Sequence, residues 1–188
     1  MIKIGITGSL ASGKTTASKI LSKNRGPLFS ADIEVKELYK RKSFKSLLKK
    51  KFGLENNRQI KKSIRRLVLK NKRNLKKLEK IIHPLVRLKM RKFISKNKNK
   101  KILFFEIPLL IESKLMKYFN VLIFIKAKEK LRLRRFMLKK GDKKLFKFLN
   151  NQQIIDKHKI KFCDHVVVND KNLYILKKKL LHIISDYE

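Results

Sequence analysis

The sequence predicts an α/β fold in which helices flank a mostly parallel sheet of five strands. Two observations lead to this fold class. Short apolar runs rich in β-branched and aromatic residues alternate along the chain with stretches of helical periodicity. The first of these changes, from strand to helix, occurs across a glycine-rich turn at residues 8–13. Strands joined through helices in this way run parallel with right-handed connections.

The first half of the chain contains two of the expected strands and a long helical stretch. An apolar strand at residues 1–7 precedes the turn and a helix at 14–24, and a second short strand covers 26–32. Residues 33–99 show a basic helical pattern, with breaks expected at Phe52–Gly53, Asn56–Asn57 and His83–Pro84.

The second half contains the other three strands. Their continuous apolar runs are typical of parallel strands that are covered on both faces. The expected strands are 100–110, 119–127 and 164–170, and the expected helices are 129–140, 145–162 and 172–186. A chain of 188 residues of which 43% are hydrophobic is expected to form one domain.

The formal net charge of +38, from 52 Lys+Arg against 14 Asp+Glu, has two interpretations. It is typical of proteins that bind nucleic acid. However, the lysines are spread along nearly the whole chain beside abundant Ile, Asn and Phe, all residues with A/T-rich codons. This favours a genomic base bias that places lysines on solvated helix faces, and we expect no specific nucleic-acid partner beyond attraction to polyanions at low salt.

Targeting, membrane and disulfide signals are absent from the sequence. It has no run of 18 apolar residues and begins directly with "MIKIGIT", so we expect a soluble cytoplasmic protein without membrane contact, as a monomer or weak oligomer. The single cysteine, Cys163, excludes an internal disulfide and has no metal-ligand spacing around it. It is expected to be a small buried hydrophobic residue.

Residues 8–15 match the pattern G-x-x-x-x-G-K-[ST] at every fixed position, between a predicted strand and a predicted helix. The glycines let backbone N–H groups turn toward phosphate oxygens, and the positive end of the helix dipole favours the anion. Lys14 is expected to reach the β and γ phosphates, and the Thr15 hydroxyl to complete the coordination of Mg²⁺. The alternative, an incidental strand-to-helix turn, does not require these residue types. The residues expected to bind ATP here are Gly8, Ser9, Leu10, Ala11, Ser12, Gly13, Lys14, Thr15 and Thr16.

A phosphate-binding loop serves many reactions, so the rest of the chain must narrow the choice. No NKxD-like guanine-reading segment follows a strand, which argues against a switch GTPase. A small-molecule kinase and an ATP-switched nucleic-acid-binding protein remain. For a kinase, Asp32 at the end of the second strand is a candidate base for the acceptor hydroxyl, although it could equally be the N-cap of the next helix.

Three further groups of residues have both a functional and a structural interpretation. The cations Arg132, Arg134, Arg135 and Lys139 precede Gly141 and could form a lid over the phosphates or a solvated helix face. Glu106 and Glu112 flank "IPLLI"; Glu106 could bind Mg²⁺ through water, and Glu112 could instead begin a helix. His83 could contact a substrate or be structural.

These pieces, in this order, resemble the dephospho-coenzyme A kinase family over nearly the whole chain. "IGITGSLASGKTT" resembles the family's "GLTGGIGSGKS", "FSADI" resembles "IDADI", and "LEKIIHPLVR" resembles a substrate-side "HP" helix. "FEIPLLIE" is similar to "DVPLLFE", which adenylate, shikimate and uridine kinases lack at this position. "Q…CDHVVVN" is similar to "Q…ADxVIxN", which aligns Gln153, Asp164 and Asn169 with family positions.

The resemblance implies a P-loop NTPase-type fold and a role for each matching residue. It implies phosphoryl transfer from ATP, with Mg²⁺, to the ribose 3′-hydroxyl of dephospho-CoA, in which Asp32 is the catalytic base and Lys14 and Arg135 neutralise the phosphoryl group. Asn169 would lie beside the adenine. The substrate side would include His83, Pro84, Pro108, Leu109 and Glu112. A helical insertion at 33–99 would shape the acceptor pocket, residues 132–147 would form a lid, and 1–32 with 100–188 would form the core. Another small-molecule P-loop kinase, acting on a nucleoside or a nucleoside monophosphate, is the alternative.

Three departures from the family pattern affect phosphate binding. Ser30 stands where the first Asp of "DAD" is usual, so Asp32 is the only carboxylate of that motif. Lys139 replaces a second lid arginine, and Lys61 and Lys62 lie where an arginine is common. Lysine lacks the planar fork that binds a phosphate through two parallel hydrogen bonds.

Overall fold

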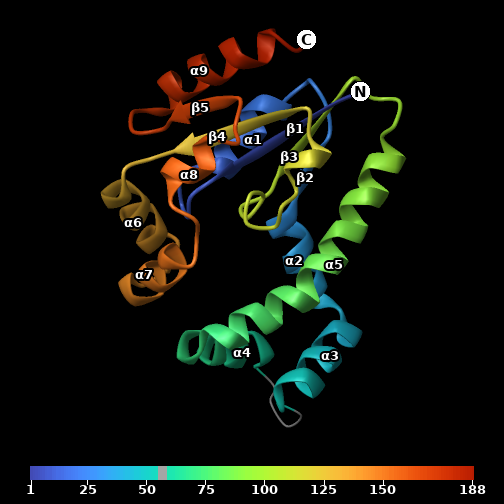
Figure 1. Cartoon of the computed structure of the whole chain (residues 1–188), viewed down its shortest axis with the longest axis vertical. Coiled ribbons are helices and arrows are strands. Elements are labelled where there is room, and N and C mark those ends of the chain that lie inside the picture. Colours follow the sequence, from blue (N-terminus) through green and yellow to red (C-terminus); the bar gives the residue numbers. More distant parts are fainter. Residues whose placement is uncertain (55–58) are drawn as a thin grey trace. The chain divides into compact units, whose positions relative to one another are not determined.

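A computed structural model describes residues 1–54 and 59–188 of the chain (Figure 1). The chain divides into two compact units, which we call the sheet unit (residues 1–30 and 94–188) and the helical unit (residues 31–93). The break expected at Asn56–Asn57 lies outside the described residues.

The sheet unit contains five parallel strands in the order β2-β3-β1-β4-β5, which confirms the predicted α/β class with a sheet that is entirely parallel. The strands are β1 (Ile2–Gly8), β2 (Leu28–Ser30), β3 (Ile102–Glu106), β4 (Val121–Lys126) and β5 (His165–Val168). Glu106 pairs in register with Ile6 on one side and with Ser30 on the other. The carboxyl ends of three strands therefore meet at one edge of the sheet, where open α/β sheets bind their ligands.

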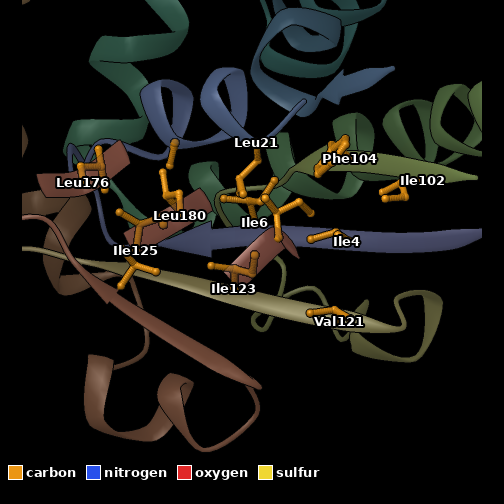
Figure 2. Packing of buried hydrophobic residues seen from close by; sticks show 13 residues of the cluster. Ile4, Ile6, Leu21, Ile102, Phe104, Val121, Ile123, Ile125, Leu176 and Leu180 are labelled. Carbon is orange, nitrogen blue, oxygen red and sulfur yellow. The ribbon is translucent and has the colours of Figure 1, made fainter. Parts of the chain in front are cut away.

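One face of the sheet packs against α1 (Lys14–Ser22) and α9 (Leu173–Ser185) through a hydrophobic cluster (Figure 2). Alternate residues of β1 point into this cluster, as the strand period of two requires. The cluster consists of Ile4, Ile6, Ala17, Leu21, Ile102, Phe104, Val121, Ile123, Ile125, Val167, Leu176, Leu180 and Ile184.

The other side of β1 packs closely at Gly5. A Cβ atom at Gly5 would lie 2.7 Å from Cδ2 of Leu122 and 2.9 Å from Cδ1 of Leu110. Nearby, the rings of Phe105 and Phe119 meet edge to face, with centroids 5.2 Å apart. Gly5 therefore allows close packing and does not belong to the phosphate-binding loop.

Helices α6 (Glu129–Leu138), α7 (Lys143–Asn151) and α8 (Asp156–Ile160) lie between β4 and β5, and a short 3-10 helix, η1 (Met116–Tyr118), precedes β4. The prediction of one helix over 145–162 was wrong, because residues 152–155 separate α7 from α8. α7 begins at an N-cap, Asp142, whose carboxylate accepts the Leu145 N–H at 2.7 Å. Periodicity alone did not reveal the interruption, because the pattern stays amphipathic through it.

The helical unit contains α2 (Ala31–Lys40), α3 (Lys42–Phe52), α4 (Ile60–Lys70) and most of α5 (Lys72–Lys96). The expected break at Phe52–Gly53 is confirmed, since α3 ends there with Gly53 in the left-handed conformation (φ 62°). The expected break at His83–Pro84 was wrong, because α5 runs through Pro84. Apolar residues continue at helical spacing on both sides of the proline, which favours one continuous helix despite the loss of one backbone hydrogen bond.

Most of the excess charge lies on the surface, as expected from solvated helix faces. In the described part of the chain, the basic side chains classed as buried are Lys14, Arg132 and Lys159. Among residues 1–54 and 59–188, no helix is both long and apolar enough to cross a membrane.

Cys163 is half-buried, not fully buried as the sequence suggested, and its Sγ donates to the Lys159 carbonyl at 3.5 Å. Burial, and secondarily the nearby Asp164 carboxylate, raise the pKa of the Cys163 thiol to about 11 against an opposing effect of Lys159. The thiolate is the form that reacts with iodoacetamide. At pH 8.5, the rate of Cys163 alkylation in the folded protein is therefore expected to be lower than in the urea-unfolded chain by a factor of about ten or more. Equal rates, measured by mass spectrometry, would contradict this pKa shift.

Candidate active site

The loop between β1 and α1 has a backbone that only glycine permits at both of its ends. Gly8 has φ 148° and Gly13 has φ 100°. A Cβ atom at Gly8 would lie 2.3 Å from the Ile125 carbonyl oxygen, and one at Gly13 would lie 2.2 Å from Nδ2 of Asn169. The positive φ angles therefore favour glycine at both fixed positions of the motif, and at Gly8 the close approach of the Ile125 backbone requires it as well.

Lys14 begins α1 and is buried, with 7% of its surface exposed. Its ammonium donates to the carbonyl oxygens of Gly8 at 3.0 Å and Ser9 at 2.8 Å, so the charge lies against the backbone of the loop. The N–H groups of a helix's first turn have no partner within the helix. The loop thus combines a cation, a helix N-terminus and a glycine backbone, an arrangement suited to phosphate oxygens.

A buried carboxylate joins the end of the loop to the neighbouring strand. Glu106, at the end of β3, is 2% exposed. It accepts hydrogen bonds from the Thr15 hydroxyl at 2.5 Å and from the Ser30 hydroxyl at 2.9 Å. Ser30, one of the departures from the family motif, therefore supports Glu106 by donating to it.

Arg135 and Asn169 converge on the loop from two other elements. The Asn169 amide donates to the Ser12 carbonyl at 2.8 Å, and Arg135 donates to the same carbonyl at 3.3 Å and to the Asn169 carbonyl at 3.0 Å. Asn169 follows β5, which adds its backbone to the sheet beside β4. The Asn169 side chain thus contacts the backbone of a residue 157 positions away in the sequence.

Arg132 holds the opposite side of the loop. It donates to the Leu10 carbonyl at 3.3 Å and to the Asn150 side chain at 2.7 Å, and its guanidinium lies 5.7 Å from the centre of the Phe146 ring. The interpretation of this run as a solvated face is therefore wrong for Arg132 and Arg135, while Arg134 and Lys139 are exposed. α6 and α7 are joined by the edge-to-face contact of Phe136 with Phe146, at 5.7 Å.

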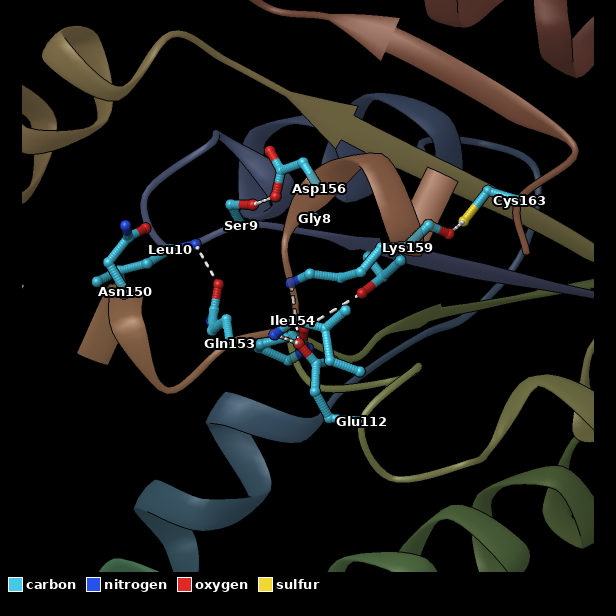
Figure 3. A network of polar contacts seen from close by, with 12 residues as sticks. Gly8, Ser9, Leu10, Glu112, Asn150, Gln153, Ile154, Asp156, Lys159 and Cys163 are labelled. Atoms are coloured by element: carbon cyan, nitrogen blue, oxygen red, sulfur yellow. Dashed lines mark hydrogen bonds and ion pairs between the residues drawn. The ribbon is translucent and has the colours of Figure 1, made fainter. Parts of the chain in front are cut away.

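The segment that includes α8 also contacts the phosphate-binding loop (Figure 3). Gln153 accepts the Leu10 N–H at 3.1 Å, and Asp156 accepts the Ser9 hydroxyl. Glu112 forms an ion pair with Lys159 at 2.9 Å and accepts the Ile154 N–H at 3.3 Å.

The other residues expected in the site divide between the two units. Pro108 and Leu109 follow β3 in the sheet unit, where the Pro108 carbonyl accepts the Thr7 hydroxyl at 3.2 Å. Asp32, His83 and Pro84 belong to the helical unit. Their contribution to the same site stays a prediction.

Asp32 lies in the first turn of α2, which begins at Ala31, and its side chain is exposed. The N-cap interpretation is therefore wrong by position, because the cap precedes the first helical residue. An exposed carboxylate in a first turn is favoured by the helix dipole and remains accessible to a substrate hydroxyl.

His83 is half-buried in α5. Burial, and to a smaller extent the positive charge of Arg87, lower the pKa of His83 below its ordinary 6.5. The imidazole is therefore neutral at pH 7. Because the folded protein disfavours the charged imidazole, the neutral His83 contributes fully to the free energy of unfolding above pH 6.5. The free energy of unfolding falls as the pH drops below that value, where the unfolded chain takes up the proton first.

The sequence did not identify two participants in this network, Asp156 and Lys159, which appeared only within a predicted helix. It placed Arg132 among the cations of a candidate lid but did not indicate its contact with Leu10. The scarcity of carboxylates, 14 in 188 residues, was the one available signal for Asp156. No pattern distinguishes Lys159 from the many surface lysines.

The arrangement favours chemistry on a phosphorylated ligand. The buried Lys14 and the arginines Arg132 and Arg135 contact the backbone of the glycine-containing loop. At the end of the loop, the Glu106 carboxylate contacts Thr15. No cluster of three or more His, Cys, Asp or Glu side chains suited to a metal occurs among residues 1–54 and 59–188. The Thr15 hydroxyl and the Glu106 carboxylate place two oxygen atoms together at the end of the loop, and oxygen is the ligand type that Mg²⁺ prefers.

The comparisons with known proteins agree with this geometry. The model of the dephospho-CoA kinase family matches residues 2–174. The dephospho-CoA kinase of Bartonella henselae is 32% identical over 187 residues, covering 97% of this chain and 96% of the relative. That of Rickettsia prowazekii is 33% identical over 189 residues, covering 100% and 98%.

Several solved structures have a fold similar to that of this chain. A protein from Thermus thermophilus named TT1252 superposes with a TM-score of 0.81 at 27% identity, covering 100% of this chain and 98% of that one. Dephospho-CoA kinase from Campylobacter jejuni superposes with a TM-score of 0.64 at 25% identity, covering 99% and 97%. Shikimate kinase from Bacteroides thetaiotaomicron, at 13% identity and a TM-score of 0.60, shares the fold. With a family match that spans residues 2–174 and a complete phosphate-binding loop, the chain belongs to the dephospho-CoA kinase family.

Proposed function

We propose that this chain transfers the γ-phosphoryl group of ATP to the ribose 3′-hydroxyl of dephospho-CoA, forming coenzyme A and ADP. The observation that carries the proposal is the convergence of Lys14, Arg135 and Asn169 on the phosphate-binding loop, within a chain matched to this family over residues 2–174. The oxygen of the acceptor hydroxyl forms the new bond to phosphorus, the bond to the bridging oxygen of ADP breaks, and the hydroxyl proton leaves with a base.

On the donor side, phosphoryl transfer depends mainly on positioning and charge stabilisation. The N–H groups at the start of α1 bind phosphate oxygens, and the Lys14 ammonium neutralises charge at the β and γ phosphates. Arg135 stabilises the charge that develops on the transferred group. Asn169, fixed against Ser12, contributes to the binding surface for the adenine.

Thr15 and Glu106 are the residues suited to hold Mg²⁺. Both offer oxygen atoms, the ligand type that Mg²⁺ prefers, and they lie within hydrogen-bond distance of each other at the end of the loop. Thr15 would bind the ion directly and Glu106 through water. When bound, the ion would offset the negative charge of the phosphate oxygens.

On the acceptor side, Asp32 accepts the proton of the 3′-hydroxyl, and the helical unit supplies the acceptor surface. His83, Pro84, Pro108, Leu109 and Glu112 contact dephospho-CoA. Residues 132–147 close over the phosphates as a lid that excludes water during transfer.

A panel of acceptors tests the proposal against other small-molecule kinases. ADP release is expected with dephospho-CoA and to stay near the background rate with AMP, uridine and shikimate. Faster release with any of these three than with dephospho-CoA would favour another P-loop kinase.

Glu106→Gln is expected to raise the Mg²⁺ concentration for half-maximal activity by about tenfold, because the loss of an outer-shell carboxylate weakens a metal site by 10–100-fold. The matched control is Ser30→Ala, which removes one hydrogen bond to Glu106 and leaves its charge. Its Mg²⁺ requirement is expected to change less. An unchanged requirement in Glu106→Gln would exclude Glu106 from the magnesium site.

A further inference from the structure

Lys159 differs from nearly every other lysine of this chain in its burial. Its surface is 0% exposed, and Lys14 and Arg132 are the other basic side chains classed as buried in the described part of the chain. Both of those contact backbone carbonyls of the phosphate-binding loop. Removing an ammonium from water has a large desolvation cost, which an apolar side chain of similar size would avoid. A genomic bias toward lysine accounts for the surface lysines but does not account for this one.

The one ion pair of Lys159 within the described residues is with Glu112 (Figure 3). Its Nζ lies 2.9 Å from Oε1 of Glu112, and the same oxygen accepts the Ile154 N–H at 3.3 Å. Within the described residues, Oε2 of Glu112 has no hydrogen-bond partner and the Lys159 ammonium forms no well-aligned hydrogen bond. One carboxylate oxygen therefore contacts both ends of a short stretch of chain, residues 154–159.

That stretch also contacts the phosphate-binding loop. We call residues 152–160 the strap segment. Gln153 accepts the Leu10 N–H at 3.1 Å, and Asp156 accepts the Ser9 hydroxyl. Glu112 contacts this segment at Ile154 and at Lys159. Asp156 lies between these two residues, and Gln153 directly precedes the first of them. The contacts of Glu112 with the strap segment and those of the strap segment with the loop thus form one connected set.

We propose that Lys159 is a positioning residue for nucleotide binding, which acts through Glu112 and the strap segment to hold Ser9 and Leu10 of the phosphate-binding loop. This inference rests on the proposed function only in its use of the loop as a nucleotide site. Lys159 does not contact the nucleotide. It fixes the segment whose side chains set the loop's conformation before the phosphates bind, so that less ordering accompanies binding.

The experiment is a calorimetric titration with ADP of the full chain, comparing Lys159→Met with Lys157→Met. Both substitutions remove one ammonium from α8, but Lys157 is exposed. The Kd for ADP is expected to rise about tenfold in Lys159→Met and to stay within about twofold of wild type in Lys157→Met. Equal affinities in wild type and Lys159→Met would overturn the proposal.

A double-mutant cycle separates positioning from a general loss of stability. If Lys159 acts through the strap segment, Gln153→Ala and Lys159→Met remove parts of the same device, so the double variant should bind ADP only slightly more weakly than the worse single variant. Fully multiplicative losses would overturn the proposed route. A lower Tm with unchanged ADP affinity in Lys159→Met would assign the residue a structural role alone and also overturn the proposal.

Glu112→Gln provides a second variant if Lys159→Met does not fold. It keeps the shape of the side chain and removes the charge, and it is expected to raise the Kd for ADP about tenfold. Wild-type affinity in Glu112→Gln would contradict the inference. Since ADP binding requires no acceptor, a chain that binds ADP but does not phosphorylate dephospho-CoA would contradict the proposed function and not this inference.

Discussion

Asp32→Asn is expected to lower kcat at least about 100-fold while the Kd for ATP stays within about twofold of wild type. The amide keeps the size of the side chain but cannot take the proton of the acceptor hydroxyl, and general-base removal costs about 10²–10⁴-fold in rate. Steady-state kinetics with dephospho-CoA and a separate ATP titration measure the two quantities.

Glu34→Gln is the matched control for Asp32. Glu34 also lies in the first turn of α2, so both substitutions remove one negative charge from the same helix terminus. The control is expected to keep near-wild-type turnover. Near-wild-type turnover in Asp32→Asn would refute the role of Asp32 as the base.

Lys14→Met is expected to lower kcat/KM by about 10³-fold, with a weakened affinity for ATP. The substitution removes the buried cation that lies against the loop, and preorganised charge at a transferring phosphoryl group is worth several kcal/mol of transition-state stabilisation. Rapid-quench kinetics and an ATP titration measure both effects, and circular dichroism checks that the chain folds.

Lys19→Met is the matched control for Lys14, because Lys19 is an exposed lysine of the same helix. It is expected to retain wild-type kcat/KM. A decrease in kcat/KM of less than tenfold in folded Lys14→Met would show that Lys14 does not stabilise the phosphates during transfer.

The donor half of the site could be predicted from the sequence because its chemistry is local. Gly8, Gly13 and Lys14 lie within seven residues, and their roles follow from backbone conformation alone. The existence of the strands was predictable from their apolar runs, but their ends were not, since the run at 100–110 continues past Glu106, where β3 stops.

Contacts between distant segments could not be predicted in the same way. Nothing in the local sequence shows that Asp156 meets Ser9 or that Arg132 meets Leu10, because these pairs depend on how α6, α7 and α8 return to the loop. The helix break predicted at His83–Pro84 was also wrong. A proline normally ends a helix, but α5 runs through Pro84, and apolar residues continue at helical spacing on both sides of it.

Ser30 illustrates how the structure changes the meaning of a departure from the family pattern. From the sequence, serine in place of the usual acid suggested a loss in the motif. In the structure, its hydroxyl donates to Glu106, which also holds Thr15. The sheet edge thus has one buried carboxylate shared by two hydroxyls, which avoids placing two negative charges side by side.

Direct identification of the product tests the central claim. Purified chain incubated with ATP, Mg²⁺ and dephospho-CoA is expected to form coenzyme A phosphorylated at the ribose 3′ position, in equal amount to the ADP released, as measured by mass spectrometry and ³¹P NMR. The folded Lys14→Met variant should form it far more slowly. ADP release without coenzyme A, or no phosphorylation of dephospho-CoA by folded wild-type chain, would contradict the account.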